Sequence, residues 1–304
     1  MSVTNVRFLR FIFAAIFISL IGAGCKSTPA GPAAATGPKG TIYMTGQIHS
    51  RTYSINLTSA GITNLFTAAD AYPTPQGTFI AVTNRGLEEI SSDGTTSRLI
   101  VKQDDQAPFN VTFDDAFHNP QLSPDGKYIA YEGQFTYVFD VYVVDRTTGA
   151  LLLTINKAGV GYGYVRPSWT PDGRIVVAGA HNNPGLYVSD AGWTSLTRID
   201  NNLTNPDLPM VSPDGTHIAF VLNSHIYTIA IDGTGLKQIT TSSGSESWPT
   251  WSTDGNWIAC YGGVNSILFL PLLAADFYNI RDISSGLNDF MTFTSTLTGQ
   301  FTWR

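Results

Sequence analysis

Charged side chains are scarce in this sequence, at 13% of 304 residues, where a globular protein usually has about a quarter. Helical bundles are rich in Glu, Lys and Arg, so this composition disfavours one. The 17 basic residues are outnumbered by 23 acidic residues, which gives a formal charge of −6. Because such a chain has no positive field to attract phosphates, we expect no nucleic-acid partner.

Long hydrophobic runs are also missing. The longest one, Phe11 to Gly24, has 14 residues, whereas a transmembrane helix needs about 20. Arg7 and Arg10 precede this run, and small residues end it. The pattern predicts a signal peptide over residues 1–24.

Cysteine is rare as well, with two residues in the chain, Cys25 and Cys260. The segment from Leu20 to Cys25, Leu-Ile-Gly-Ala-Gly-Cys, resembles the lipobox of bacterial lipoproteins, with Gly22 where that motif usually has leucine. The resemblance implies that Cys25 is lipidated and anchors the protein in a membrane. An ordinary secretory signal is the alternative. Cys260 alone cannot form an intramolecular disulfide, and its place at the end of an apolar strand predicts a buried thiol.

The residues after Cys25 indicate a cellular location and a flexible tether. Lys26 stands where lipoproteins of the inner membrane have aspartate, so we expect an outer-membrane lipoprotein that faces the periplasm or the cell surface. Residues 25–40 are rich in Pro, Gly and Ala, which is typical of a flexible tether. The globular domain is expected over residues 41–304.

That domain is built from a repeat. Four segments share the pattern Pro-x-x-Ser/Thr-Pro/Thr-Asp-Gly, and residues 71–77 form a degraded copy that ends in Gln76-Gly77; the four are Pro120–Gly126, Pro167–Gly173, Pro209–Gly215 and Pro249–Gly255. The closing glycines of the five copies are 49, 47, 42 and 40 residues apart. Pro, Asp and Gly are residues of tight turns, and a β-rich run follows each copy. This is the period of a four-stranded propeller blade.

The ends of the domain complete the count of blades. Residues 41–66 supply three strands without a preceding turn motif, and the C-terminal segment Gly299–Arg304 has the character of the missing inner strand. Five full copies and one split copy predict an all-β, six-bladed propeller. Pairing the N- and C-terminal strands in one blade would remove exposed sheet edges.

The repeat resembles that of the TolB-like family of six-bladed propellers, which carry WD-like repeats and occur in bacterial envelope proteins. The resemblance extends over residues 41–304. It implies the fold more strongly than a function, because the family includes scaffolds, ligand binders and the propeller halves of peptidases.

Motifs of catalysis are absent from the sequence. There is no Gly-x-Ser-x-Gly, no phosphate-binding loop and no dinucleotide fingerprint. The repeated aspartates, Asp125, Asp172, Asp214 and Asp254, recur at the same turn of different blades, so we interpret them as turn residues. We interpret His217 as a structural residue of a strand. His49, His118, His181 and His225 lie near loops of one face but lack the spacing of a metal site. The sequence therefore predicts no cofactor and no metal.

The loops between blades contain the candidate binding residues. The loop over residues 102–118 has two pairs of acids among three phenylalanines, and two further loops combine aromatics with Gly or Ser. Phe109, Phe113 and Phe117 have the alternative role of filling gaps between blades. Rigid aromatic and charged side chains on such loops suit recognition. The predicted binding residues are Asp104, Asp105, Asp114, Asp115, His118, Asn119, Tyr162, Tyr164, Arg166, Glu246 and Trp248.

Two functions are consistent with this sequence. The first is a non-enzymatic, monomeric envelope lipoprotein whose propeller face binds a protein, a peptide or a cell-wall glycan. The alternative is a propeller enzyme, of the lactonase or lyase type, with a metal in the central channel. The inner-strand positions that would hold this metal are Asp70, Asn119, Arg166, Leu208 and Trp248, a mixture that suits a metal poorly.

Overall fold

The computed structural model describes residues 38–46, 51–59, 61–103, 117–134, 139–155, 163–179, 184–199, 202–262, 267–272 and 301–304. These residues belong to one compact unit, Pro38–Arg304. The predicted signal segment, Cys25 and most of the predicted tether lie outside the described residues. Within the described part of the chain, no helix combines the length and the apolar character needed to cross a bilayer.

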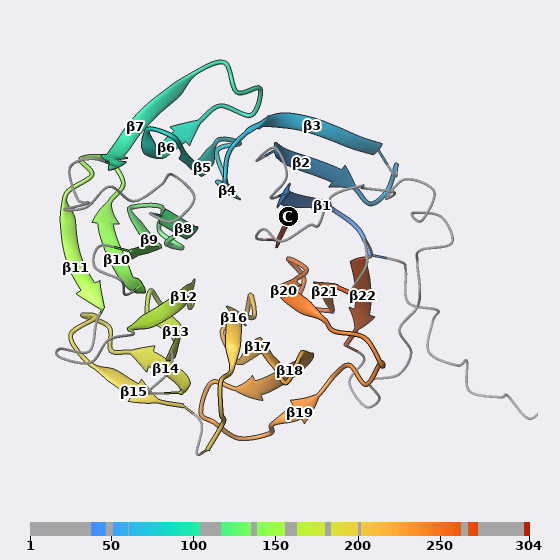
Figure 1. The fold of residues 1–304 in the computed structure, drawn as a ribbon. Coiled ribbons are helices and arrows are strands. Elements are labelled where there is room, and N and C mark those ends of the chain that lie inside the picture. Colours follow the sequence, from blue (N-terminus) through green and yellow to red (C-terminus); the bar gives the residue numbers. More distant parts are fainter. Residues whose placement is uncertain are drawn as a thin grey trace, which may run out of the picture. The chain divides into compact units, whose positions relative to one another are not determined.

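The described unit is a ring of six antiparallel sheets, as the repeat predicts (Figure 1). Blade 1 has the strand order β23-β1-β2-β3. Its strands are β23 (Phe301–Trp303), β1 (Thr41–Gly46), β2 (Arg51–Asn56) and β3 (Gly61–Thr67). Blade 2 consists of β4 (Asp70–Pro73), β5 (Phe79–Thr83), β6 (Gly86–Ile90) and β7 (Ser97–Lys102). Blade 3 consists of β8 (Phe117–Leu122), β9 (Tyr128–Gln134), β10 (Phe139–Asp145) and β11 (Leu151–Ile155).

The second half of the ring repeats this arrangement. Blade 4 consists of β12 (Tyr164–Trp169), β13 (Ile175–Gly179), β14 (Gly185–Ser189) and β15 (Leu196–Arg198). Blade 5 consists of β16 (Asp207–Val211), β17 (His217–Leu222), β18 (His225–Ala230) and β19 (Lys237–Gln238). In blade 6 the described residues form β20 (Ser247–Trp251), β21 (Trp257–Tyr261) and β22 (Ile267–Pro271).

The first strand of each blade lies innermost, and these inner strands contact one another in sequence from β4 to β8, β12, β16, β20 and β23. Blade 1 closes the ring. Its inner strand β23 comes from the C-terminus and pairs with β1, and Trp303 lies opposite Ile42. The Trp303 indole donates a hydrogen bond of 2.7 Å to the Lys39 carbonyl oxygen. Lys39, which the sequence assigned to the tether, is thus part of the closure.

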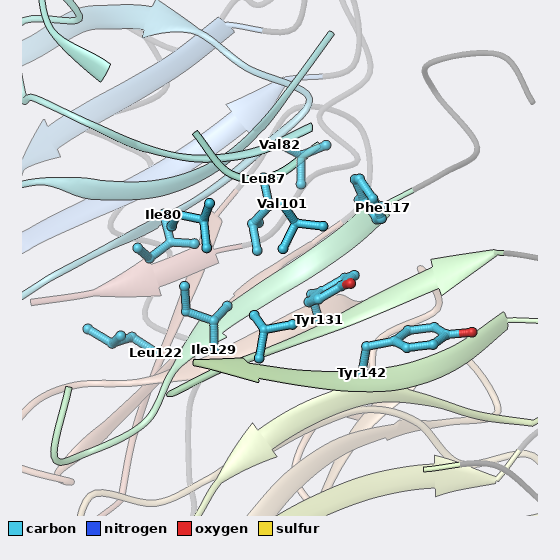
Figure 2. Packing of buried hydrophobic residues seen from close by; sticks show 11 residues of the cluster. Ile80, Val82, Leu87, Val101, Phe117, Leu122, Ile129, Tyr131 and Tyr142 are labelled. Carbon is cyan, nitrogen blue, oxygen red and sulfur yellow. The ribbon is translucent and has the colours of Figure 1, made fainter. Parts of the chain in front are cut away.

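Apolar side chains between neighbouring blades form the core. In Figure 2, Val82 of blade 2 lies near Phe117 of blade 3, and Ile80 of blade 2 lies across from Leu122 and Ile129. Phe117 is 1% exposed, and its ring meets that of Tyr131 edge to face at 5.2 Å. Burying one such side chain stabilises the fold by about 1.5–3 kcal/mol. Phe117 therefore fills the gap between two blades.

The repeated aspartates stabilise turns, as the sequence predicts. Each accepts a hydrogen bond from the Ser or Thr hydroxyl two residues earlier: Asp125 from Ser123, Asp172 from Thr170, Asp214 from Ser212 and Asp254 from Ser252. The glycine that follows has a positive φ, +74° at Gly215, which glycine adopts readily. Each of these turns follows its inner strand, so the turns lie at the C-terminal ends of the inner strands.

Candidate functional site

Four inner strands share an irregularity where they begin. The pairing of each with its neighbouring strand shifts register at an X-Pro step, between His118 and Gln121 in β8 and at the matching places of β12, β16 and β20. The residues before the prolines have φ values of 50°, 59°, 53° and 54°. We call these residues the bulge positions: Asn119, Arg166, Leu208 and Trp248.

A positive φ is unusual at these positions. Non-glycine residues in this region carry strain of about 1–3 kcal/mol, and a residue before proline normally has an extended conformation. Blade 2 shows that the inner strand of a propeller blade does not require a positive φ at this position. Its inner strand has Ala71 in place of the proline and keeps a continuous ladder, with Asp70 opposite Val82 and Ala71 opposite Ala81.

The bulge positions surround one pocket on the inner side of blades 3 to 6. We call it the mouth pocket; its lining is completed by Gln121, Pro167, Pro209, Met210 and Pro249. It is open to solvent, and the cavity between its walls has a volume of about 20 Å³. The walls are mostly apolar. Such a shape, with a few polar groups among apolar walls, is typical of ligand sites.

Gln121 is the polar residue of the pocket whose side chain has the fewest interactions. Its side chain is buried, at 4% exposure, and none of the hydrogen bonds found among the described residues involves its carboxamide. Its polar atoms are not among the fully buried side-chain atoms that lack a partner, so they face the open space of the pocket. The carboxamide is therefore available to a ligand in the mouth pocket.

Arg166 makes electrostatic contacts with residues from three neighbouring blades around the pocket. Its Nη1 lies 3.3 Å from Glu132 Oε2 and its Nε lies 3.5 Å from Asp207 Oδ1. The guanidinium carbon lies 5.4 Å from the centre of the Trp248 ring, a cation–π contact. Burial lowers the pKa of Arg166, but the carboxylates of Glu132, Asp207 and Asp70 raise that pKa by more. The Nε atom is buried and makes no hydrogen bond.

Asn119 forms hydrogen bonds with two buried carboxylates beside the pocket. Its backbone N–H donates to Asp70 Oδ2 at 3.0 Å, and its Nδ2 donates to Glu132 Oε2 at 2.8 Å. Asp70 is 5% exposed and Glu132 is 3% exposed. These carboxylates connect the inner strands of blades 2, 3 and 4 and hold the backbone of the first bulge.

Glu246 is a buried anchor. It is 2% exposed and accepts hydrogen bonds from His225 Nδ1 at 2.8 Å, from Thr240 Oγ1 at 2.7 Å and from Ser242 Oγ. Burial raises the pKa of Glu246, but these hydrogen bonds lower it by more, and the net direction is downward. Glu246 thus fixes the segment that leads to Trp248.

The remaining predicted binding residues have other places. Tyr164 is buried, at 7% exposure, and packs edge to face on Tyr187 at 5.1 Å. Packing is therefore its role, and it does not line the mouth pocket. His118 is half-buried beside the Phe139 ring. The other five predicted binding residues lie outside the described residues: Asp104, Asp105, Asp114, Asp115 and Tyr162. Phe109, Phe113, His49 and His181 lie outside the described residues as well.

The structure therefore brings together three predicted residues: Asn119, Arg166 and Trp248. It adds Gln121 and Met210, which sequence reasoning did not select, and Leu208, which was named only as an inner-strand position of the metal alternative. The X-Pro step common to four inner strands was the available signal. His217 lies at the start of β17, where it is exposed and its backbone N–H donates to Ser212 Oγ at 2.9 Å. Among the described residues, no three His, Cys, Asp or Glu side chains gather as a metal site would require.

Comparison with known proteins identifies the family. Residues 92–291, more than half of the chain, match the family model described as the TolB beta propeller domain. The chain belongs to this family. Its membership accounts for the repeat, the six blades and the absence of helices among the described residues.

Two curated relatives show how far the sequence similarity extends. An uncharacterized protein of Agrobacterium fabrum, Atu1656, is 25% identical over 154 residues, which cover 45% of this chain and 52% of that protein. The Tol-Pal system protein TolB of Francisella tularensis is 33% identical over 82 residues, covering 24% of this chain and 19% of that protein. The matches thus span about half or less of these relatives.

Solved structures share the fold. A putative TolB from Agrobacterium tumefaciens aligns with a TM-score of 0.57 at 17% identity and covers 78% of this chain and 86% of that one. A puromycin hydrolase aligns at 0.53 with 14% identity, covering 79% and 43%. An oligogalacturonate lyase solved with manganese aligns at 0.51 with 11% identity, covering 76% of each chain. At these identities the likeness extends to the fold alone.

Proposed function

We propose that this protein is a non-enzymatic binding module of the cell envelope, and that the mouth pocket captures an extended peptide segment of a partner protein. The observation that carries the proposal is the Gln121 carboxamide, which lines the pocket among apolar walls and has no hydrogen-bond partner among the described residues. A carboxamide both donates and accepts hydrogen bonds, as does a peptide unit. A peptide backbone could therefore pair with Gln121 while its apolar side chains lie against Leu208 and Met210 at the open side of the pocket.

Charge supports a neutral or weakly charged segment. The one cation that lines the pocket, Arg166, already faces Glu132 and Asp207, so it offers no unbalanced positive charge to an anion. Trp248, Leu208, Met210 and three prolines supply contact area without further charge. Trp and Arg are frequent among residues that dominate binding energy.

The same contacts favour binding over catalysis. Glu132 accepts from Asn119 and faces Arg166, and Asp70 accepts from the Asn119 backbone. Both carboxylates thus have structural partners at the pocket. A catalytic acid or a metal ligand would have to give up these bonds, so we favour a partner-binding role over the lactonase or lyase alternative.

The proposed location in the cell envelope rests on the N-terminal segment and on relatives named as Tol-Pal system proteins. Cys25 would carry the lipid anchor. We expect Cys25→Ala to release the protein from membranes and to abolish labelling with palmitate. A wild-type protein that is recovered soluble and unlabelled would contradict the anchor without touching the binding proposal.

Site-specific photo-cross-linking tests the binding proposal. A benzoylphenylalanine is placed at Leu208 in the pocket or, as a control, at Leu236 of the same blade, which is 48% exposed and follows the far end of β18. After irradiation of native envelopes, position 208 should give a discrete adduct that maps to one peptide segment of one protein, and position 236 should not. Adducts to a glycan, or adducts at position 236 alone, would contradict the proposal.

A further inference from the structure

The four bulge positions differ from one another although the strands that present them are alike. They carry an amide, a guanidinium, an aliphatic group and an indole: Asn119, Arg166, Leu208 and Trp248. The flanking motif, by contrast, is repeated, with proline next and the Pro/Thr-Asp-Gly turn beyond it. Constant backbone with variable side chains around one pocket is the arrangement of a recognition surface on a rigid scaffold.

We infer that the residue before the bulge proline is the specificity-determining position in blades 5 and 6, and that Leu208 and Trp248 each select one side chain of the bound peptide. Asn119 and Arg166 are held by Glu132 instead. The inference rests on the proposed function. The backbone is the first reason. The left-handed φ and the register shift occur in the four inner strands that line the mouth pocket, and the continuous strand β4 contributes nothing to its lining.

The fixed frame is the second reason. The following prolines cannot donate to the ladder, and Pro167, Pro209 and Pro249 line the pocket themselves. Buried contacts on either side hold the frame; for example, the Ser168 hydroxyl accepts from the Val211 backbone N–H at 3.0 Å. A different side chain at Leu208 or Trp248 therefore changes what the pocket contacts, not how the strand is placed.

Leu208 offers the clearest test because its aliphatic side chain forms no hydrogen bond or ion pair with the frame, and it is half-buried. A library of random 12-residue peptides displayed on phage is selected against wild-type protein, Leu208→Lys and the control Leu236→Lys. Wild type and Leu236→Lys should enrich the same sequences. Leu208→Lys should enrich sequences with Asp or Glu at one position where the others have an apolar residue.

A second variant separates recognition from folding. Leu208→Gly removes the side chain while glycine accepts a φ of 53° without strain. It should keep the wild-type melting temperature within about 2 °C and bind the wild-type-selected peptide about tenfold more weakly or worse, the factor expected when an interface anchor worth about 1.4 kcal/mol is lost.

The outcomes distinguish the two proposals. If wild type enriches no peptide family, the proposed function fails. If it does, but Leu208→Lys and Leu208→Gly select and bind the same peptides as wild type, the proposed function stands and the specificity inference is overturned. A large loss of melting temperature in Leu208→Gly would also overturn it, because Leu208 would then serve packing.

Discussion

Ring closure depends on a short C-terminal strand, and the substitution Trp303→Ala probes it. Trp303 is 3% exposed and packs with Ile42, Met44 and Phe269 in the core cluster between blades 1 and 6. Replacing a buried Trp by Ala costs about 3–5 kcal/mol. A typical domain has a total stability of about 5–15 kcal/mol, so this one substitution removes a large fraction.

The expected shift follows from this loss. For a protein of this size each kcal/mol lowers the melting temperature by about 2–4 °C, so Trp303→Ala should melt roughly 6–20 °C below wild type in calorimetry. Trp303→Phe is the matched control. It keeps an aromatic ring and loses the hydrogen bond to the Lys39 carbonyl, which is worth about 1 kcal/mol.

Amide hydrogen exchange locates the effect. In β1, Thr41 N–H donates to the Arg304 carbonyl oxygen at 2.6 Å, and Arg304 N–H donates to the Thr41 carbonyl oxygen at 2.9 Å. Exchange of β1 amides should accelerate in Trp303→Ala more than exchange of β13 amides in blade 4. A Trp303→Ala protein that melts with wild type and keeps its β1 protection would refute closure by β23.

Three further predictions concern charged and reactive groups. Burial raises the pKa of Glu89, but hydrogen bonds from Arg146, Thr78 and Arg98 bring it from 4.5 down to about 2. This stabilisation, on the order of 3 kcal/mol, is complete above pH 4.5 and is lost as the pH falls towards 2; urea titrations should show that Glu89→Gln loses more stability at pH 7 than at pH 3. Asp214→Ala should cost about 1 kcal/mol in urea unfolding by removing turn hydrogen bonds, and unchanged peptide binding would separate the turns from the mouth pocket. Burial, and secondarily the Glu246 charge, raise the pKa of the Cys260 thiol; in a Cys25→Ser protein, a disulfide reagent at pH 8 should react with Cys260 only after unfolding, and rapid reaction of folded protein would contradict its burial.

Much of the fold could be predicted from the sequence because turn chemistry repeats. Four copies of the Pro/Thr-Asp-Gly turn set the period, and the apolar run after each copy fixes a strand. The split blade followed from a missing strand at one end and a surplus strand at the other. β23 pairs with β1 as expected, since an unpaired edge would be unfavourable.

The site was harder to predict because it depends on backbone irregularities and on contacts distant in sequence. In a regular strand, side chains alternate between faces, and Tyr164 and Arg166 would share one. The register shift after Val165 breaks this alternation, so Tyr164 packs inside while Arg166 reaches the pocket. Glu246 was predicted as a binding residue. Its burial depends on His225, which is 21 residues away in the chain.

One measurement tests the central claim, that the mouth pocket binds a partner's peptide segment, most directly. The segment mapped from the Leu208 adduct is synthesised, and its dissociation constant is measured by calorimetry for wild type, Leu208→Ala and Leu236→Ala. Both leucines belong to blade 5, but only Leu208 lines the pocket. The account predicts that Leu208→Ala weakens binding about tenfold or more, equivalent to about 1.4 kcal/mol, while Leu236→Ala leaves it unchanged. Equal dissociation constants for wild type and Leu208→Ala would contradict it.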